Sequence, residues 1–156
     1  MTGTDNTFGR DDPFDLNRFT MAQGKIYDTV LAELRSGMKQ SHWIWFIFPQ
    51  IDGLGHSPTS KHYAIKSIAE ARQYLKHPIL GARLVECAET VMAVKGRSAS
   101  QIFGFPDDMK LKSSMTLFAV VAENPNSVFA SVLEKYFQGE QDDRTLQLLG
   151  VLKGKA

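Results

Sequence analysis

The stretch PILGARLVECAETVMAVKG, residues 78–96, has the clearest helical pattern in the chain. Proline is favoured in the first turn of a helix and glycine just beyond its end, and Pro78 and Gly96 stand at these two places. The apolar residues between them recur at spacings of three and four, which places them on one helical face. They are Ile79, Leu80, Leu84, Val85, Cys87, Ala88, Val91 and Met92. The stretch therefore predicts an amphipathic helix.

Similar helical segments lie on both sides of this one. Ser67 stands where a helix N-cap belongs, and Gly37 stands where a C-terminal glycine stop belongs. Strand-like alternation of apolar and polar residues is nearly absent. We therefore predict an all-α fold, a single irregular globular domain of about seven or eight short helices over residues 13–150. Residues 1–12 are expected to be a disordered tail and residues 151–156 a frayed one.

The segment HWIWFIF, residues 42–48, is ambiguous between helix and strand. Its aromatic and β-branched residues favour a strand. Ser41 as an N-cap and the helical neighbours favour a short buried helix, which we prefer because a lone strand would have no partner. Residues 49–59 contain two glycines and two prolines and predict a loop. Gly53 and Gly55 are expected to adopt positive φ in that loop.

Composition narrows the class of protein. A chain of 156 residues with 43% apolar residues is long enough to bury a core as one domain. The net charge of +1 supplies no field for nucleic acid, which is therefore not an expected partner. The single cysteine, Cys87, excludes an intramolecular disulfide and is expected to be a buried structural residue. With no apolar leader and no membrane-length apolar run, we expect a cytoplasmic protein without membrane contact.

The familiar signatures of catalytic and metal sites are missing from the sequence. It contains no HExxH, no cysteine pair, no GxSxG and no GxGxxG motif. Lys112 precedes Ser113 and Ser114, and a lysine can activate a serine, but these three residues do not have the SxxK order. We therefore predict no metal and no cofactor, and the catalytic residues, if there are any, stay unknown.

Residues 42–63 hold the best candidate for a ligand site. An apolar wall, with Trp45 and Phe48 in it, runs into a glycine-containing loop and then into a polar cluster, a combination found in small-molecule pockets. Arg83 or Lys112 would hold a phosphate. Each residue also has a structural interpretation: core for the aromatic rings, turn for the loop, surface for the cations. The candidate ligand-binding residues are His42, Trp45, Gln50, Ser57, His62, Tyr63, Arg83 and Lys112.

Two functions from different classes are compatible with these features. The first is binding or processing of a nucleotide-like small molecule by the 42–63 segment. The alternative is a non-catalytic protein-interaction domain, in which the same segment supplies core and surface loop. The sequence identifies no protein partner for this alternative.

Four segments of the chain resemble a small bacterial family of unknown function, whose members are sometimes labelled calpastatin. They are DLNRFTMAQ (15–23), SHWIWFIFPQIDGLGHS (41–57), AEARQYLKHPILGARL (69–84) and DDMKLKSSMTLF (107–118). The resemblance implies a mostly helical single domain. It implies no reaction and supplies no catalytic residues.

A second resemblance concerns six residues. PTSKHY, residues 58–63, is similar to the P-T-x-E-H-Y box of the YbiA-like family, which is linked to NAD and ADP-ribose chemistry and to cleavage of N-glycosidic bonds. The similarity implies a ligand related to ADP-ribose or NAD. Lys61 stands where that family has glutamate, so the acid/base group of the box is missing here.

Overall fold

The computed structural model describes residues 12–151. Within them it has helices and no β-strand beyond one isolated bridge, which confirms the all-α fold. The helices among residues 12–151 number ten, more than the seven or eight expected, because several are only one or two turns long. They are α2 (Asn17–Gly24), α3 (Tyr27–Ser36), α4 (Ile44–Ile47), α5 (Pro58–Tyr63), α6 (Ile68–Lys76), α7 (Leu80–Ala93), α8 (Ala99–Phe103), α9 (Asp107–Val121), α10 (Val128–Phe137) and α11 (Asp143–Leu149). Apart from Asp12 and Val151, the two predicted tails lie outside the described residues.

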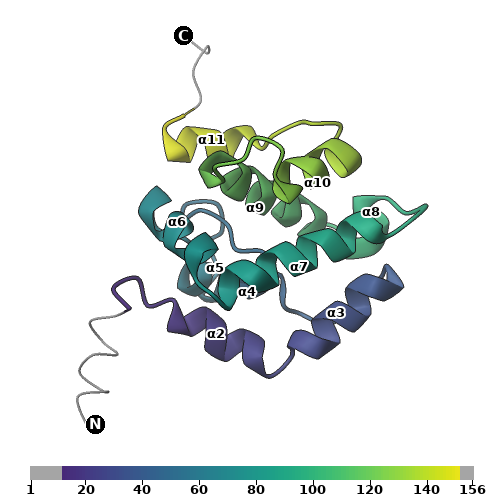
Figure 1. Ribbon diagram of the computed structural model, residues 1–156, viewed down its shortest axis with the longest axis horizontal. Helices are drawn as coiled ribbons and strands as arrows, with labels where there is room; N and C mark the ends of the chain where they lie inside the picture. Colours follow the sequence, from purple (N-terminus) through teal and green to yellow (C-terminus); the bar gives the residue numbers. More distant parts are fainter. Residues whose placement is uncertain (1–11, 152–156) are drawn as a thin grey trace.

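Helix α9 is the centre of the fold. Every residue from Leu111 to Phe118 is buried, because α4, α6, α8, α10 and α11 pack around it (Figure 1). Buried polar groups need hydrogen-bond partners, and two of those on α9 face the segment that leads into α11. Lys112 pairs with Glu140, and Thr116 accepts the backbone N–H of Asp142 at 2.9 Å. The polar side chains of α9 therefore bind the segment that leads into α11 and hold that helix against α9.

Helix α7 confirms the amphipathic pattern of residues 78–96. It packs against α3, α6 and α10, and its buried residues other than Gly81 fall on the predicted face. Ile79, which was also predicted on that face, precedes the helix and is 46% exposed. The helix begins at Leu80, two residues after Pro78, which precedes the first turn instead of lying in it. Gly81 explains how closely α6 and α7 approach, since a Cβ at this position would lie 2.1 Å from the Leu75 carbonyl oxygen. Gly37 ends α3 with φ +75°, as predicted.

The ambiguous segment 42–48 contains a single helical turn, α4, so the preference for helix is confirmed. Trp43 and Phe48 are fully buried in the core. The prediction for Ser41 was wrong, because Trp43 occupies the N-cap position and makes no side-chain cap. The Ser41 hydroxyl instead donates to the carboxylate of Glu33.

Glu33 is a hydrogen-bond hub that fixes the entry to α4. Its carboxylate accepts the Ser41 hydroxyl, the backbone N–H groups of Gln40 and Ser41, and the indole N–H of Trp43 at 2.9 Å. Partial burial acts to raise the pKa of Glu33, but these hydrogen bonds outweigh it and lower the pKa from 4.5 to about 2. The charged carboxylate therefore stabilises the position of α4.

The 49–57 loop is tied back to the chain after α5. Ile51 and Ile65 form a parallel bridge, in which the Asp52 N–H donates to the Ile65 carbonyl and the Ile65 N–H donates to the Gln50 carbonyl, both at 2.8 Å. Gly53 has φ +109°, as predicted. Gly55 does not adopt positive φ, which corrects the prediction. A side chain does not fit at position 55, since a Cβ there would lie 2.5 Å from the Ser60 Cβ.

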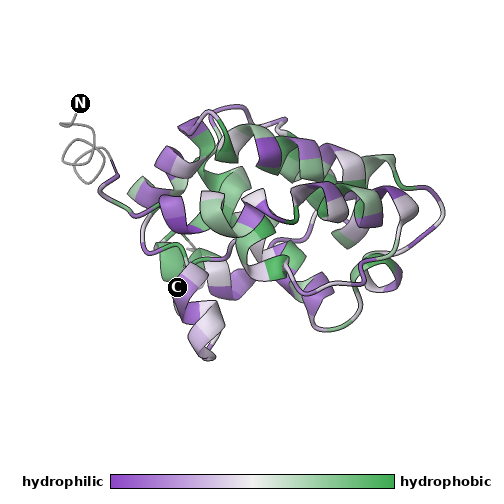
Figure 2. Ribbon diagram, turned by 90° about the horizontal axis from the view of Figure 1, so that it is seen from below, coloured by the Kyte–Doolittle hydropathy of each residue, from purple (hydrophilic) through white to green (hydrophobic). Residues whose placement is uncertain are grey.

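Hydropathy follows the packing of the helices. In Figure 2 the apolar residues gather where helices face one another, and polar residues lie mostly on the outside. Among residues 12–151, no helix is both long and apolar enough to cross a membrane.

Candidate functional site

Three of the predicted ligand-binding residues meet at one place. Trp45, Gln50 and Tyr63 line a hollow together with Ser60 and Gly55. The bridge between residues 51 and 65 brings them together, because it folds the loop back over α4. The hollow has a volume of only about 10 Å³, which is room for roughly one water molecule. In this conformation the three residues form a packed junction.

Ser57 and His62 lie at the two ends of α5. The Ser57 hydroxyl caps the helix by accepting the Ser60 N–H at 3.1 Å, a structural role. His62 is exposed, and its ring meets the Tyr63 ring edge to face, with 4.6 Å between their centroids. Tyr63 in turn packs against Phe46 and Phe19. The aromatic cluster thus holds the C-terminal end of α5 in place and leaves His62 on the surface.

A larger groove opens beside His62, between the start of α2 and the segment from α5 to α6. Its volume is about 350 Å³. We call it the α5 groove. It is lined by Phe14, Asp15, Arg18, Lys61, His62, Lys66 and Glu70.

Arg18 forms the floor of the α5 groove and uses all of its donors within the protein. Its Nη2 donates to Glu70 Oε2 at 2.7 Å and to the Ala64 carbonyl at 2.9 Å. Its Nε donates to the His62 carbonyl, and Nη1 donates to two carbonyls at the start of α2. The side chains of Arg18 and Glu70 are 9% and 1% exposed, so the pair is buried. Arg18 therefore joins α2, α5 and α6 and is not available as a bidentate ligand clamp.

The rim of the groove is cationic. Lys66 donates from Nζ to the carbonyls of Lys61 and Ala64, at the C-terminal end of α5. Lys61 is exposed, and within residues 12–151 its amine makes no hydrogen bond of its own. The groove is thus lined by three cationic side chains, those of Arg18, Lys61 and Lys66. Two carboxylates, those of Asp15 and Glu70, also line it. This balance and the exposed His62 imidazole suit a small anion better than a cation.

The remaining predicted residues lie elsewhere. Arg83 donates to Gln23 Oε1 at 3.3 Å, and its guanidinium lies 4.8 Å from the centroid of the Tyr27 ring. Lys112 pairs with Glu140, in the segment that leads into α11. His42 is exposed in the segment before α4 and lines neither the loop hollow nor the α5 groove. Neither Arg83 nor Lys112 lines the loop hollow or the α5 groove, and both bind partners within the protein.

Comparison with known proteins agrees with the architecture. Residues 13–149 match a family described as "Protein of unknown function (DUF1810)". The chain belongs to this DUF1810 family. A solved structure, of the conserved hypothetical protein Rv1873 from Mycobacterium tuberculosis, is 52% identical in sequence. The similarity covers 90% of this chain and 100% of that one, with a TM-score of 0.87. No curated protein matches the sequence.

Membership in DUF1810 confirms the resemblance to a helical family of unknown function. Neither the family nor the Mycobacterium tuberculosis protein supports the calpastatin label or the likeness to the YbiA-like family. Neither assigns a ligand or a reaction, so the site in this DUF1810 chain has to be argued from its own geometry.

The serine–lysine interpretation has a structural alternative in this DUF1810 fold. The Ser113 hydroxyl donates to the Met109 carbonyl and to Asp142 Oδ2 at 3.2 Å, and Lys112 is bound to Glu140. These contacts attach α11 to α9. The Ser114 hydroxyl is buried and has no hydrogen-bond partner within the described residues. Its neighbour Lys112 points away to Glu140, so the arrangement does not activate a serine.

Cys87 has the properties expected of a structural residue in the DUF1810 fold. Its side chain is 1% exposed, and burial raises the pKa of its thiol to about 12. At neutral pH the thiolate is therefore scarce, and the thiol is a poor nucleophile.

Of the residues that line the α5 groove, only His62 was among the ligand-binding residues predicted from the sequence. Glu70 was recognisable only as a helix-start residue, and it does lie in the first turn of α6, where the Ser67 hydroxyl accepts its N–H. The residues around Glu70 do not indicate that its side chain pairs with Arg18, which lies 52 residues earlier in the chain.

Proposed function

We propose that this protein binds a small, anionic, nucleotide-like molecule in the α5 groove. The observation that carries the proposal is the meeting of Lys61, Lys66, Arg18 and His62 around one groove of about 350 Å³. That volume is within the range of small-molecule sites. ADP-ribose and NAD are the first molecules to test, because Lys61 and His62 belong to the PTSKHY segment that resembles the YbiA-like box.

Each group in the groove has a distinct part in such binding. The exposed Lys61 amine supplies a mobile point charge for a phosphate. His62 offers a ring N–H and a ring face, and its edge-to-face contact with Tyr63 fixes its orientation. Arg18 contributes charge from below while its hydrogen bonds maintain the shape of the groove. The phosphate would therefore lie nearest Lys61, and a base or sugar would lie against His62.

The test is a thermal-shift titration with AMP, ADP-ribose and NAD. A ligand at 100 times its dissociation constant adds about 2.7 kcal/mol to stability. For a chain of this length the melting temperature then rises by roughly 5–11 °C. Lys61→Glu should weaken binding about three- to tenfold, since a charge is removed and its opposite is introduced.

Lys95→Glu is the matched control. Lys95 is exposed, follows α7 and does not line the α5 groove, so this variant should bind as the wild type does. If none of the three nucleotides shifts the melting temperature, or if Lys61→Glu and Lys95→Glu weaken binding equally, the α5 groove is not the site.

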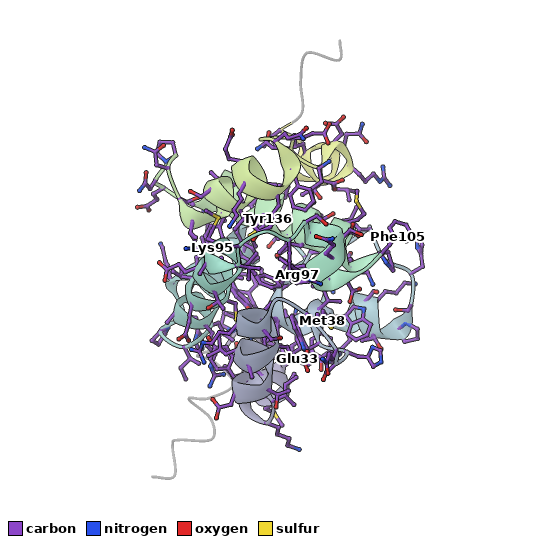
Figure 3. All side chains as sticks on the ribbon, turned by 90° about the vertical axis from the view of Figure 1, so that its right-hand side faces the viewer. Glu33, Met38, Lys95, Arg97, Phe105 and Tyr136 are labelled. Carbon is purple, nitrogen blue, oxygen red and sulfur yellow. The ribbon has the colours of Figure 1, made fainter. Side chains whose placement is uncertain are left out.

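A protein-interaction role is the second candidate, and one region favours it. Phe105 is 81% exposed, and Met38 and Met109 are 46% and 42% exposed. The Lys39 N–H donates to the Ile102 carbonyl at 2.7 Å, which places Met38 beside the end of α8 (Figure 3). Light scattering with Phe105→Ser tests this role: a wild-type oligomer that becomes monomeric supports it, and a monomeric wild type counts against self-association.

A further inference from the structure

A second pocket lies next to the α5 groove, with Phe14 lining both. It sits between the start of α2, the end of α6 and the start of α7, and has a volume of about 300 Å³. None of the residues predicted from the sequence as ligand-binding lines it. We call it the Asp12–His77 pocket. Its polar lining, apart from Lys76, consists of Asp12, Asn17, Thr20, Gln73 and His77.

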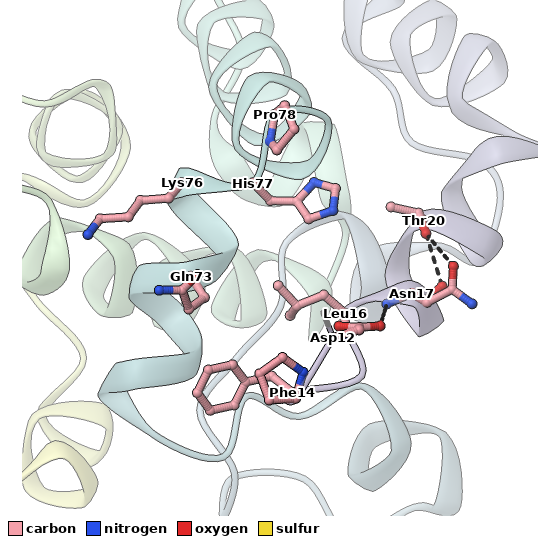
Figure 4. Close-up of a pocket in the computed structure, with 10 residues that line it drawn as sticks. Asp12, Phe14, Leu16, Asn17, Thr20, Gln73, Lys76, His77 and Pro78 are labelled. Carbon is pink, nitrogen blue, oxygen red and sulfur yellow. Dashed lines mark hydrogen bonds between the residues drawn. The ribbon is translucent and has the colours of Figure 1, made fainter. Parts of the chain in front are cut away.

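His77 presents a hydrogen-bond donor to this pocket. Its Nδ1 accepts the backbone N–H groups of Ile79 and Leu80, at 3.1 and 3.2 Å. Because Nδ1 is an acceptor, the ring hydrogen lies on Nε2. Figure 4 shows the ring directed toward the side of the pocket formed by Asn17 and Thr20. Lys76 also lines the pocket, and in Figure 4 its amine is directed away from the His77 ring.

The opposite wall is a fixed set of oxygen acceptors. Asp12 accepts the Leu16 N–H on Oδ1 at 2.6 Å and the Asn17 N–H on Oδ2 at 3.0 Å. Each carboxylate oxygen has about two lone-pair sites, so both can accept a further hydrogen bond. The single hydrogen of the Thr20 hydroxyl is shared between the Asn17 carbonyl and Asn17 Oδ1, each 3.1 Å from Thr20 Oγ1, which leaves the lone pairs of that oxygen open to a ligand. These contacts hold the wall in place before any ligand arrives.

The rest of the lining is apolar. Leu16 is 6% exposed, and Phe14, Pro13 and Pro78 complete the surface around it. A ligand here must therefore combine several hydrogen-bonding groups with a compact carbon face. A carboxylate at one wall disfavours an anion, because like charges repel. A wholly apolar molecule would leave the polar groups unpaired at a cost.

We propose that the Asp12–His77 pocket binds a neutral polyhydroxylated ring, such as a monosaccharide or the sugar part of a larger molecule. A sugar hydroxyl both donates and accepts, so it can donate to Asp12 and accept from His77 Nε2. The Gln73 amide carries both kinds of group as well, whereas the Asn17 amide already accepts from Thr20 and donates to Met21 Sδ. The C–H face of the ring packs on Phe14 and Leu16. This site does not depend on the α5 groove being occupied.

Saturation-transfer NMR with D-ribose, D-glucose and D-galactose at high millimolar concentration tests the proposal, with cyclohexanol as a ring of one hydroxyl. At least one sugar should receive saturation and cyclohexanol should not. Thr20→Val and Gln73→Leu each remove polar atoms from side chains at the pocket and should weaken sugar binding about three- to tenfold. Both side chains are at least partly exposed, so both variants should fold.

Lys61→Glu distinguishes the two sites. Sugar binding that survives Lys61→Glu and weakens in Thr20→Val or Gln73→Leu supports the proposal, whatever the outcome of the nucleotide titration. The proposal is overturned if no sugar receives saturation, if cyclohexanol receives as much as the sugars, or if Thr20→Val and Gln73→Leu bind as the wild type does. Loss of sugar binding in Lys61→Glu alone also overturns it, because the sugar would then lie in the α5 groove.

Discussion

Replacement of Arg18 by methionine tests how much of the fold depends on one buried side chain. Arg18 donates to Glu70 Oε2 at 2.7 Å and to four backbone carbonyls, and Glu70 is 1% exposed. Removing one member of a buried ion pair leaves the other charge without compensation, at a cost of about 3–5 kcal/mol. Since the whole stability of a domain is only about 5–15 kcal/mol, Arg18→Met should be severely destabilising.

Urea denaturation measures the effect directly. The midpoint should fall with little change in slope, and the melting temperature should drop by about 6–20 °C. Glu70→Gln in the Arg18→Met background should restore about 1–3 kcal/mol, because the glutamine is neutral and can still accept the Lys66 N–H. Arg72→Met, at an exposed position of α6, should stay within about 0.5 kcal/mol of wild type.

Two results would refute this reasoning. If Arg18→Met costs less than about 1 kcal/mol, water reaches the pair and screens it as at a surface. If the double variant is no more stable than Arg18→Met, the cost comes from the lost carbonyl contacts and not from the isolated charge of Glu70.

Three further predictions concern other parts of the chain. The pKa of Glu33 is lowered to about 2, so the contribution of its carboxylate to folding stability is present above pH 4.5 and is lost as the pH falls toward 2. Glu33→Gln removes this contribution, so the stability of the variant should change less across that pH window. Acid titrations of both proteins followed by circular dichroism measure the difference. Gly55→Ala should cost about 1–3 kcal/mol in urea denaturation, and Ser60→Gly added to it should recover part of the loss, because the new Cβ would lie 2.5 Å from the Ser60 Cβ. Cys87 should react with a thiol reagent only at the rate of unfolding, and fast reaction in the native state would contradict its burial and its pKa of about 12.

The sequence by itself determined the helical class of the fold and some of the helix ends. The period of apolar residues in α7 and the glycine after α3 are local signals, because a helix needs neighbours only three or four residues away. The same locality explains the errors. Ser41 has the right residue type for an N-cap but is held by Glu33, and Gly55 is glycine because of Ser60, a contact that its own turn does not reveal.

The tertiary structure alone decided which functional groups meet. Trp45, Gln50 and Tyr63 were predicted together and do meet, because the bridge between residues 51 and 65 closes a short loop. Arg18 and Glu70 are 52 residues apart, and the sequence around either residue does not predict that the two pair. Arg83 and Lys112 were expected to bind phosphate, yet packing of α7 on α3 and of α11 on α9 directs them to internal partners. Side-chain chemistry can be read locally, but the partner of a charge is set by how distant helices pack to bury apolar surface.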